Sequence, residues 1–212
     1  AITDAVGTSQ TVTNGASLSG TSISLTDDAT DVLSVGGNAS FMASGGGSIT
    51  VAAAGTANFG SSTFTTTGTV LINEDSSTAF AATSSGATMT VNSAGAMSDL
   101  ESDGANEITG TSLTLTASGG VGTGAAQIHI AVTNLDVSNT TGGGIFVTDT
   151  AGGLILTDLG GPNTNAVNGV GSGGEIRASS PLTIASDAIT SGGMTYTASD
   201  SGVGDHLTVN SA

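Results

Sequence analysis

Acidic side chains alternate in the segment from residue 99 to 107, DLESDGANE. Oxygen-bearing residues at positions 1, 3 and 5, followed by Gly at position 6, are typical of the start of a calcium-binding loop. Position 12, where such a loop carries a bidentate Glu, is Gly110 here, so the other interpretation is a solvated acidic loop. The candidate calcium ligands are Asp99, Glu101, Asp103 and Glu107.

A second group of carboxylates lies nearer the N-terminus, at Asp27, Asp28 and Asp31. Wherever the fold stacks successive segments, it brings like charges close together, and a bound cation would relieve their repulsion. These three residues are therefore weaker candidates for the same ion, with a solvated turn as the alternative.

The chain offers few residues that could support catalysis. It has no Cys and only two His, His129 and His206, and the nucleophile motif G-x-S-x-G is absent. His129 lies between two Ile residues, so alternation turns it outward, as a surface imidazole. Residues 169–174 satisfy G-x-G-x-x-G, but a strand pattern follows them where a dinucleotide site needs a helix. We expect no enzyme, and among enzymes a polysaccharide-cleaving β-helix would be the alternative.

The charge balance restricts the classes of partner that the chain could bind. It has seventeen Asp and Glu but only one Arg and no Lys, for a net charge of −16 over 212 residues. Nucleic-acid affinity depends on Lys and Arg that release counterions from phosphates, so nucleic acid is excluded as a partner, and anionic membrane surfaces are excluded in the same way. No apolar run approaches the ~18 residues of a membrane helix, so we expect no membrane insertion.

Apolar residues recur at every second position across the chain, and turn residues follow each short run. This period of two, with Gly- and Asn-rich punctuation, predicts strands with one buried face. In the central block, residues 112–161, the starts of successive pairs from Ile128 onward lie too close together for crossover helices. This spacing favours a coil that stacks on itself. The central pairs are Leu113/Leu115, Ile128/Ile130, Leu135/Val137, Ile145/Val147 and Leu154/Leu156.

These elements predict an all-β fold, a parallel β-solenoid with essentially no α-helix. Coils would take about 17 to 20 residues with two strands each, or about 25 with three. We expect residues 1–212 to form a single solenoid domain, with irregular loops near 93–110 and 163–174.

A degenerate repeat links residues 80–94 to residues 196–212, and both copies contain TVNSA. Solenoid coils are buried only by neighbouring coils, and neither terminus carries a recognisable cap. We therefore expect a segment or subunit of a longer array. Ala1 in place of an initiator Met is expected to be a processed or trimmed end.

Three large apolar side chains are expected on the outer face. Alternation that buries the flanking residues turns Phe146, Ile155 and Leu71 outward, with Phe146 and Ile155 expected on adjacent strands. Exposed apolar patches tend to mark interfaces, so these residues are candidates for a lateral contact between subunits; a covering loop is the alternative.

Segments such as SLTLTASGGVGT, NLDVSNTTGGGIFVTD and GGLILTDLGG are rich in Gly, Thr, Ser and Asn. In this they resemble the repeats of large bacterial surface adhesins of the filamentous-haemagglutinin and autotransporter-passenger type. The resemblance covers nearly the whole chain and rests on repeat style, without a catalytic motif. It implies a right-handed parallel β-helix. It also implies a secreted, extracellular or cell-surface protein that acts in adhesion or builds a fibre, as in a biofilm.

The sequence therefore predicts a structural or adhesive solenoid that self-associates end to end or into a filament, with surface glycans or neighbouring cells as targets. The alternative is a carbohydrate- or receptor-binding β-helix module. Calcium is the one cofactor that the residues suggest.

Overall fold

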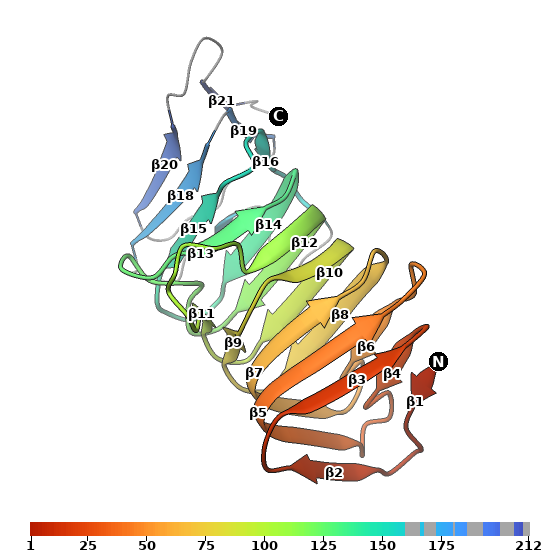
Figure 1. The fold of residues 1–212 in the computed structure, drawn as a ribbon. Coiled ribbons are helices and arrows are strands. Elements are labelled where there is room, and N and C mark those ends of the chain that lie inside the picture. Colours follow the sequence, from red (N-terminus) through yellow and green to blue (C-terminus); the bar gives the residue numbers. More distant parts are fainter. Residues whose placement is uncertain (160–165, 168–172, 180, 186–192, 200–205, 210–212) are drawn as a thin grey trace.

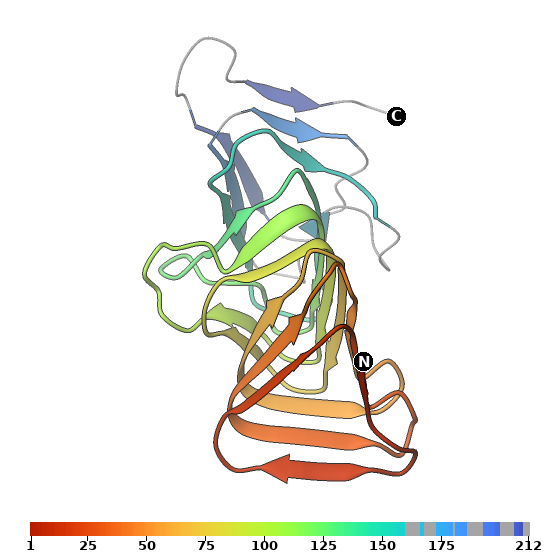
Figure 2. The same cartoon turned by 45° about the vertical axis from the view of Figure 1, so that its right-hand side comes forward.

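The computed structural model describes residues 1–159, 166–167, 173–179, 181–185, 193–199 and 206–209. These residues form strands and no helix, and every strand pairing given is parallel. The chain winds into a β-solenoid of about eight turns, which confirms the predicted fold class. The coils rise from the N-terminal end to the C-terminal end (Figure 1), and the turned view shows the three-sided outline of the first coils (Figure 2).

One ladder of parallel strands runs the length of the described structure, because one strand from each coil pairs with its counterparts above and below. Its strands, in order, are β1 (Ile2–Thr3), β4 (Ile23–Leu25), β6 (Ile49–Val51), β8 (Thr69–Glu74), β10 (Ser84–Ser93), β12 (Ile108–Ala117), β14 (Asn134–Asn139), β16 (Leu154–Leu156), β19 (Leu182–Ile184) and β21 (Leu207–Val209).

The remaining strands form the other sides of the coils, and the long strands β10 and β12 bend around a corner to join two sides. They are β2 (Ser9–Val12), β3 (Ala16–Gly20), β5 (Val32–Ala43), β7 (Thr56–Thr65), β9 (Thr78–Phe80), β11 (Met97–Asp99), β13 (Ile128–Ala131), β15 (Ile145–Asp149), β17 (Ala166–Val167), β18 (Gly174–Ala178) and β20 (Met194–Ala198).

Coil length varies along the stack. Val70 pairs with Met89, 19 positions on, whereas Leu156 pairs with Ile184, 28 positions on. One coil contains three strand segments, for example β8, β9 and the start of β10. The expected irregular stretch at 93–110 contains β11 and the loop 100–107, whereas most of 163–174 lies outside the described residues.

The core is a set of aliphatic columns inside the coils. All five apolar pairs of the central block are fully buried, as the alternation predicts. Register places one member of each coil directly above the last, so each side chain is buried by its neighbours in adjacent coils. One such column contains Ile23, Ile49, Val70, Met89, Leu113, Leu135, Leu156 and Ile184.

Candidate metal centre and polar groove

The acidic segment at 99–107 folds as a tight loop at the end of β11. Asp99 Oδ1 accepts hydrogen bonds from the backbone N–H groups of Glu101 and Ser102, each at 2.8 Å. Ser102 (φ 49°) and Gly104 (φ 76°) take left-handed backbone conformations, which turn the chain back on itself. The loop thereby holds the Asp99 carboxylate in place, with only 7% of the residue exposed.

The four predicted calcium ligands line one small cavity of about 130 Å³, but they do not act as one group. Asp99 and Glu107 are buried, whereas Glu101 and Asp103 are exposed. Asp99, Glu107 and His129 form a compact group instead, with one potential ligand atom from each lying within 4.8 Å of the others. We call these three residues the metal centre. The structure thus joins two of the four candidates to a residue that sequence reasoning had placed on the surface.

His129 reaches this group from the neighbouring coil. It faces outward from β13 between two buried Ile residues, as the alternation predicts, and its Nδ1 lies 3.8 Å from Glu107 Oε2. The backbone N–H of His129 also donates to Glu107 Oε2. Burial, with smaller contributions from the charges of Asp99 and Asp103, raises the pKa of Glu107 to about 7, although the hydrogen bond from His129 lowers it.

The N-terminal carboxylates form a second group with altered membership. Asp27 and Asp31 lie with Asp4, their ligand atoms within 4.8 Å of one another, and Asp28 is not part of the group. Asp28 instead accepts hydrogen bonds from the backbone and hydroxyl of Thr30. Asp31 is fully buried, and its two carboxylate oxygens accept backbone N–H groups of Thr8 (2.7 Å) and Asp28 (3.1 Å), which gives this residue a structural role in the turn.

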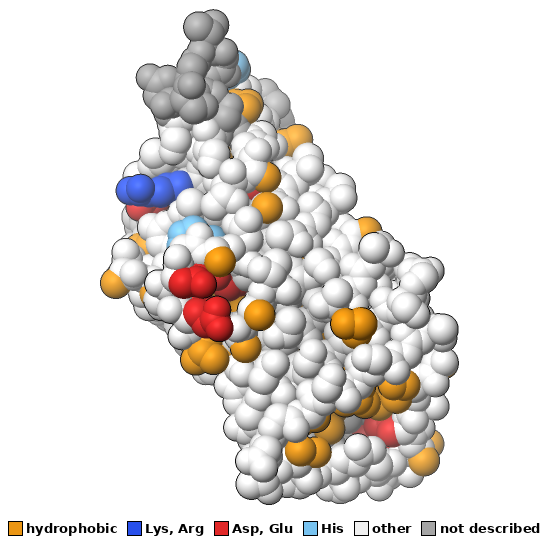
Figure 3. All heavy atoms as spheres, in the orientation of Figure 1, with side chains coloured by type: hydrophobic (Ala, Val, Ile, Leu, Met, Phe, Trp, Pro, Cys, Tyr) orange, Lys and Arg blue, Asp and Glu red, His pale blue; other side chains and the backbone are white. Residues whose placement is uncertain are grey.

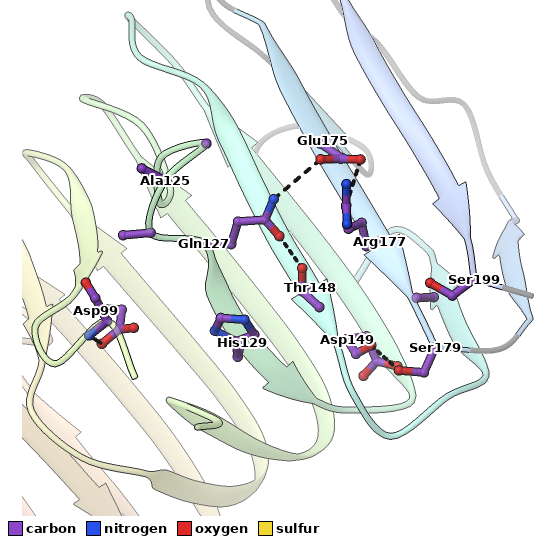
Figure 4. A pocket seen from close by; sticks show the side chains of 14 residues that line it. Asp99, Ala125, Gln127, His129, Thr148, Asp149, Glu175, Arg177, Ser179 and Ser199 are labelled. Carbon is purple, nitrogen blue, oxygen red and sulfur yellow. Dashed lines mark hydrogen bonds and ion pairs between the residues drawn. The ribbon is translucent and has the colours of Figure 1, made fainter. Parts of the chain in front are cut away.

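A polar groove of about 470 Å³ opens beside the metal centre (Figure 4). Its wall includes Gln127, which directly precedes β13, and Thr148 on β15. It also includes Glu175 and Arg177 on β18. Arg177 Nε lies 2.8 Å from Glu175 Oε1, and this contact lowers the pKa of Glu175. Gln127 links three successive coils, because it donates to Glu175 on β18 at 3.4 Å and accepts from the hydroxyl of Thr148 on β15.

The groove belongs to one side of the molecule. In the space-filling view, acidic, His and Arg side chains gather along that side, while polar or backbone atoms cover most of the rest of the visible face (Figure 3). Parallel register explains this gathering, since His129, Thr148 and Arg177 occupy matching outward positions in successive coils.

The three predicted interface residues all face outward and are partly exposed, but they do not form one patch. Phe146 lies on β15, whose partners are β13 and β18, whereas Ile155 lies on β16, whose partners are β14 and β19. The two strands therefore belong to different sides of the coil and are not adjacent. Leu71 shares the side of Ile155 but lies several coils away. The lateral contact itself stays a prediction.

Sequence reasoning missed His129, Gln127 and the Glu175–Arg177 pair as members of one site. Glu107 and His129 are 22 residues apart, which is one coil. A fixed coil length would have placed them side by side, but the irregular loop at 100–107 hides that length.

A search of protein families, curated proteins and solved structures finds no match for this chain. Among the described residues, no helix is long and apolar enough to cross a membrane.

Proposed function

We propose that this chain is a structural and adhesive segment of an extracellular β-solenoid, which supplies length and stiffness and lengthens by stacking further coils of the same kind. The observation that carries this proposal is the continuous parallel ladder from β1 to β21 with its uninterrupted aliphatic columns. A stack of this kind transmits its register from coil to coil, so added coils extend it without a change of geometry.

The exposure of the last described coil supports continued stacking. Leu207 and Val209 occupy core columns above Leu182 and Ile184, yet 45% and 64% of them are exposed. One more coil over β21 would bury both side chains, and burial of one aliphatic side chain contributes about 1.5–3 kcal/mol. The exposed edge of β21 would also supply backbone groups that pair with the added strand.

The outer surface suits an exposed location. Polar side chains form ladders between coils, such as Asn92 Nδ2, which donates to Asn73 Oδ1 at 2.7 Å. With one Arg and no Lys, the chain offers a trypsin-like protease almost no cleavage site. These features, together with the resemblance to surface adhesins, support the proposed extracellular role.

A substitution at the exposed edge tests the stacking. Val209→Lys places a charge in the core column at β21, and inward charges on an edge strand block further pairing. We expect the unsubstituted chain to form elongated particles by negative-stain imaging at high protein concentration, and Val209→Lys to remain as single particles. Thr208→Lys is the matched control, because Thr208 alternates outward on the same strand and should leave assembly intact. Equal assembly by all three proteins would contradict the proposal.

The polar groove favours a second function, the binding of a carbohydrate. Gln127, Thr148, Glu175 and Arg177 present amide, hydroxyl and charged groups that suit the hydrogen bonding of sugar hydroxyls. Arg177→Ala should then abolish binding on a glycan array, whereas Val209→Lys should not affect it. Absence of any bound glycan with the unsubstituted chain would count against this alternative and leave the structural function standing.

A further inference from the structure

Two buried atoms of the metal centre point to an ion. Asp99 Oδ2 and His129 Nδ1 are buried and have no hydrogen-bond partner within the part of the chain that the structure describes. Asp99 is more than nine-tenths buried, with 7% exposed. Burying a carboxylate oxygen without a hydrogen-bond donor costs several kcal/mol of free energy. Such an atom therefore requires a compensating ligand.

The surrounding structure already orients the three side chains. Two backbone N–H groups fix Asp99 through Oδ1, which leaves Oδ2 for another partner. The His129 N–H fixes Glu107. Potential ligand atoms from all three residues lie within 4.8 Å of one another, and hydrogen bonds of this outer kind are what hold metal ligands in position.

The donor set selects the kind of metal. One imidazole nitrogen and two carboxylate oxygens match the ligands of zinc and related transition metals, whereas calcium is held by oxygen alone. We propose that Asp99, Glu107 and His129 bind one divalent transition-metal ion, for which Zn²⁺ is the probe, with the remaining coordination position open to the polar groove. The two carboxylates balance the charge of the ion, and Asp99 and His129 line the groove. In this proposal Asp99 and Glu107 bind a transition metal together with His129, in place of calcium in an all-oxygen loop.

Calorimetric titration of the full chain, first treated with a chelator, tests the site. We expect one Zn²⁺ per chain, and more than about a tenfold loss of affinity in His129→Gln and in Asp99→Asn, because even outer-shell changes cause 10- to 100-fold losses at zinc sites. His206→Gln is the matched control: it removes the other imidazole of the chain, which is exposed, and should leave zinc affinity unchanged.

A measurement on the unsubstituted chain identifies the zinc ligands directly, so it does not depend on whether the variants fold. X-ray absorption at the zinc edge of the unsubstituted, zinc-loaded chain should show one nitrogen and at least two oxygen ligands. A spectrum without imidazole overturns the proposal, as does zinc binding that His129→Gln leaves unchanged. Tighter binding of Ca²⁺ than of Zn²⁺ would also overturn it and return the segment at 99–107 to the calcium interpretation.

Discussion

Buried carboxylates fix the backbone at several bends of this solenoid. Asp31, Glu74 and Asp149 are almost fully buried, and each accepts backbone N–H groups, in several cases from an adjacent coil. Bends leave backbone donors that the strand ladders do not satisfy, and a carboxylate oxygen is a strong acceptor for them. In a chain without Lys, these acids are thus structural. The sequence pattern had assigned Asp31 to an ion site or a solvated turn.

Glu74 makes this role measurable through pH. Burial raises the pKa of Glu74 above its ordinary value of 4.5, so the folded state holds its proton more tightly than the unfolded chain. Stability from this group is therefore fully present below the unfolded pKa and is lost as pH rises through the folded pKa. We expect the free energy of unfolding of Glu74→Gln, measured by denaturant titration, to decrease less than that of the unsubstituted chain between about pH 4 and pH 8.

Glu101→Gln is the control for this comparison, because Glu101 is an exposed glutamate whose charge does not contribute to the raised pKa of Glu74. It should follow the pH dependence of the unsubstituted chain. If Glu74→Gln followed the same curve as the unsubstituted chain, the buried carboxyl would not carry the effect.

At the scale of the element, stacked glycines let neighbouring coils approach closely at one bend. Gly86 pairs with Gly110 between β10 and β12, and a methyl group on Gly110 would lie 2.2 Å from the carbonyl oxygen of Gly86. No side chain fits such a gap without moving the backbone.

Gly110→Ala should therefore destabilise the fold by about 1–3 kcal/mol, the usual effect of overpacking, as thermal and denaturant unfolding would measure. Gly142→Ala is the matched control, because nothing lies within 4 Å of its added methyl group. It should be neutral or slightly stabilising. Equal losses for the two variants would show that close packing at the bend is not the cause.

The phenylalanine stack near the N-terminal end tests the core columns. Phe41 and Phe64 are paired across β5 and β7, fully buried, with ring centroids 5.7 Å apart and planes within 11°. Phe64→Ala should lower the free energy of unfolding by about 3–5 kcal/mol, and Phe64→Leu by clearly less, since Leu refills most of the space. A loss below about 1 kcal/mol for Phe64→Ala would contradict tight packing between these coils.

Alternation predicted the strands well, because a buried face constrains every second residue. Leu113, Leu115 and their counterparts are buried as expected. Register between coils could not be predicted so well, since insertions at the bends change coil length. The repeated TVNSA aligns Val91 with Val209 in sequence, yet in the structure Val209 continues the column of Met89. For the same reason the sequence found Asp99 and Glu107 but not their partner His129, one coil away.

At the scale of the whole molecule, a one-sided charge opposes association. With a net charge of −16, stacked copies repel one another, and salt screens that repulsion over a Debye length of about 10 Å at 0.1 M. We expect the average particle mass, measured by light scattering, to rise as NaCl increases from about 0.01 M to 0.3 M. A fall in mass with salt would show that ionic attraction, rather than apolar and backbone contacts, drives assembly.

The central claim is that the chain functions as coils in an extensible parallel stack. Fibre diffraction from aligned, concentrated protein tests this claim most directly. We predict a strong reflection near 4.8 Å along the fibre axis, because the strands lie across the axis of a lengthening solenoid. Compact single particles at every concentration, or a 4.8 Å reflection perpendicular to the fibre axis, would contradict the account.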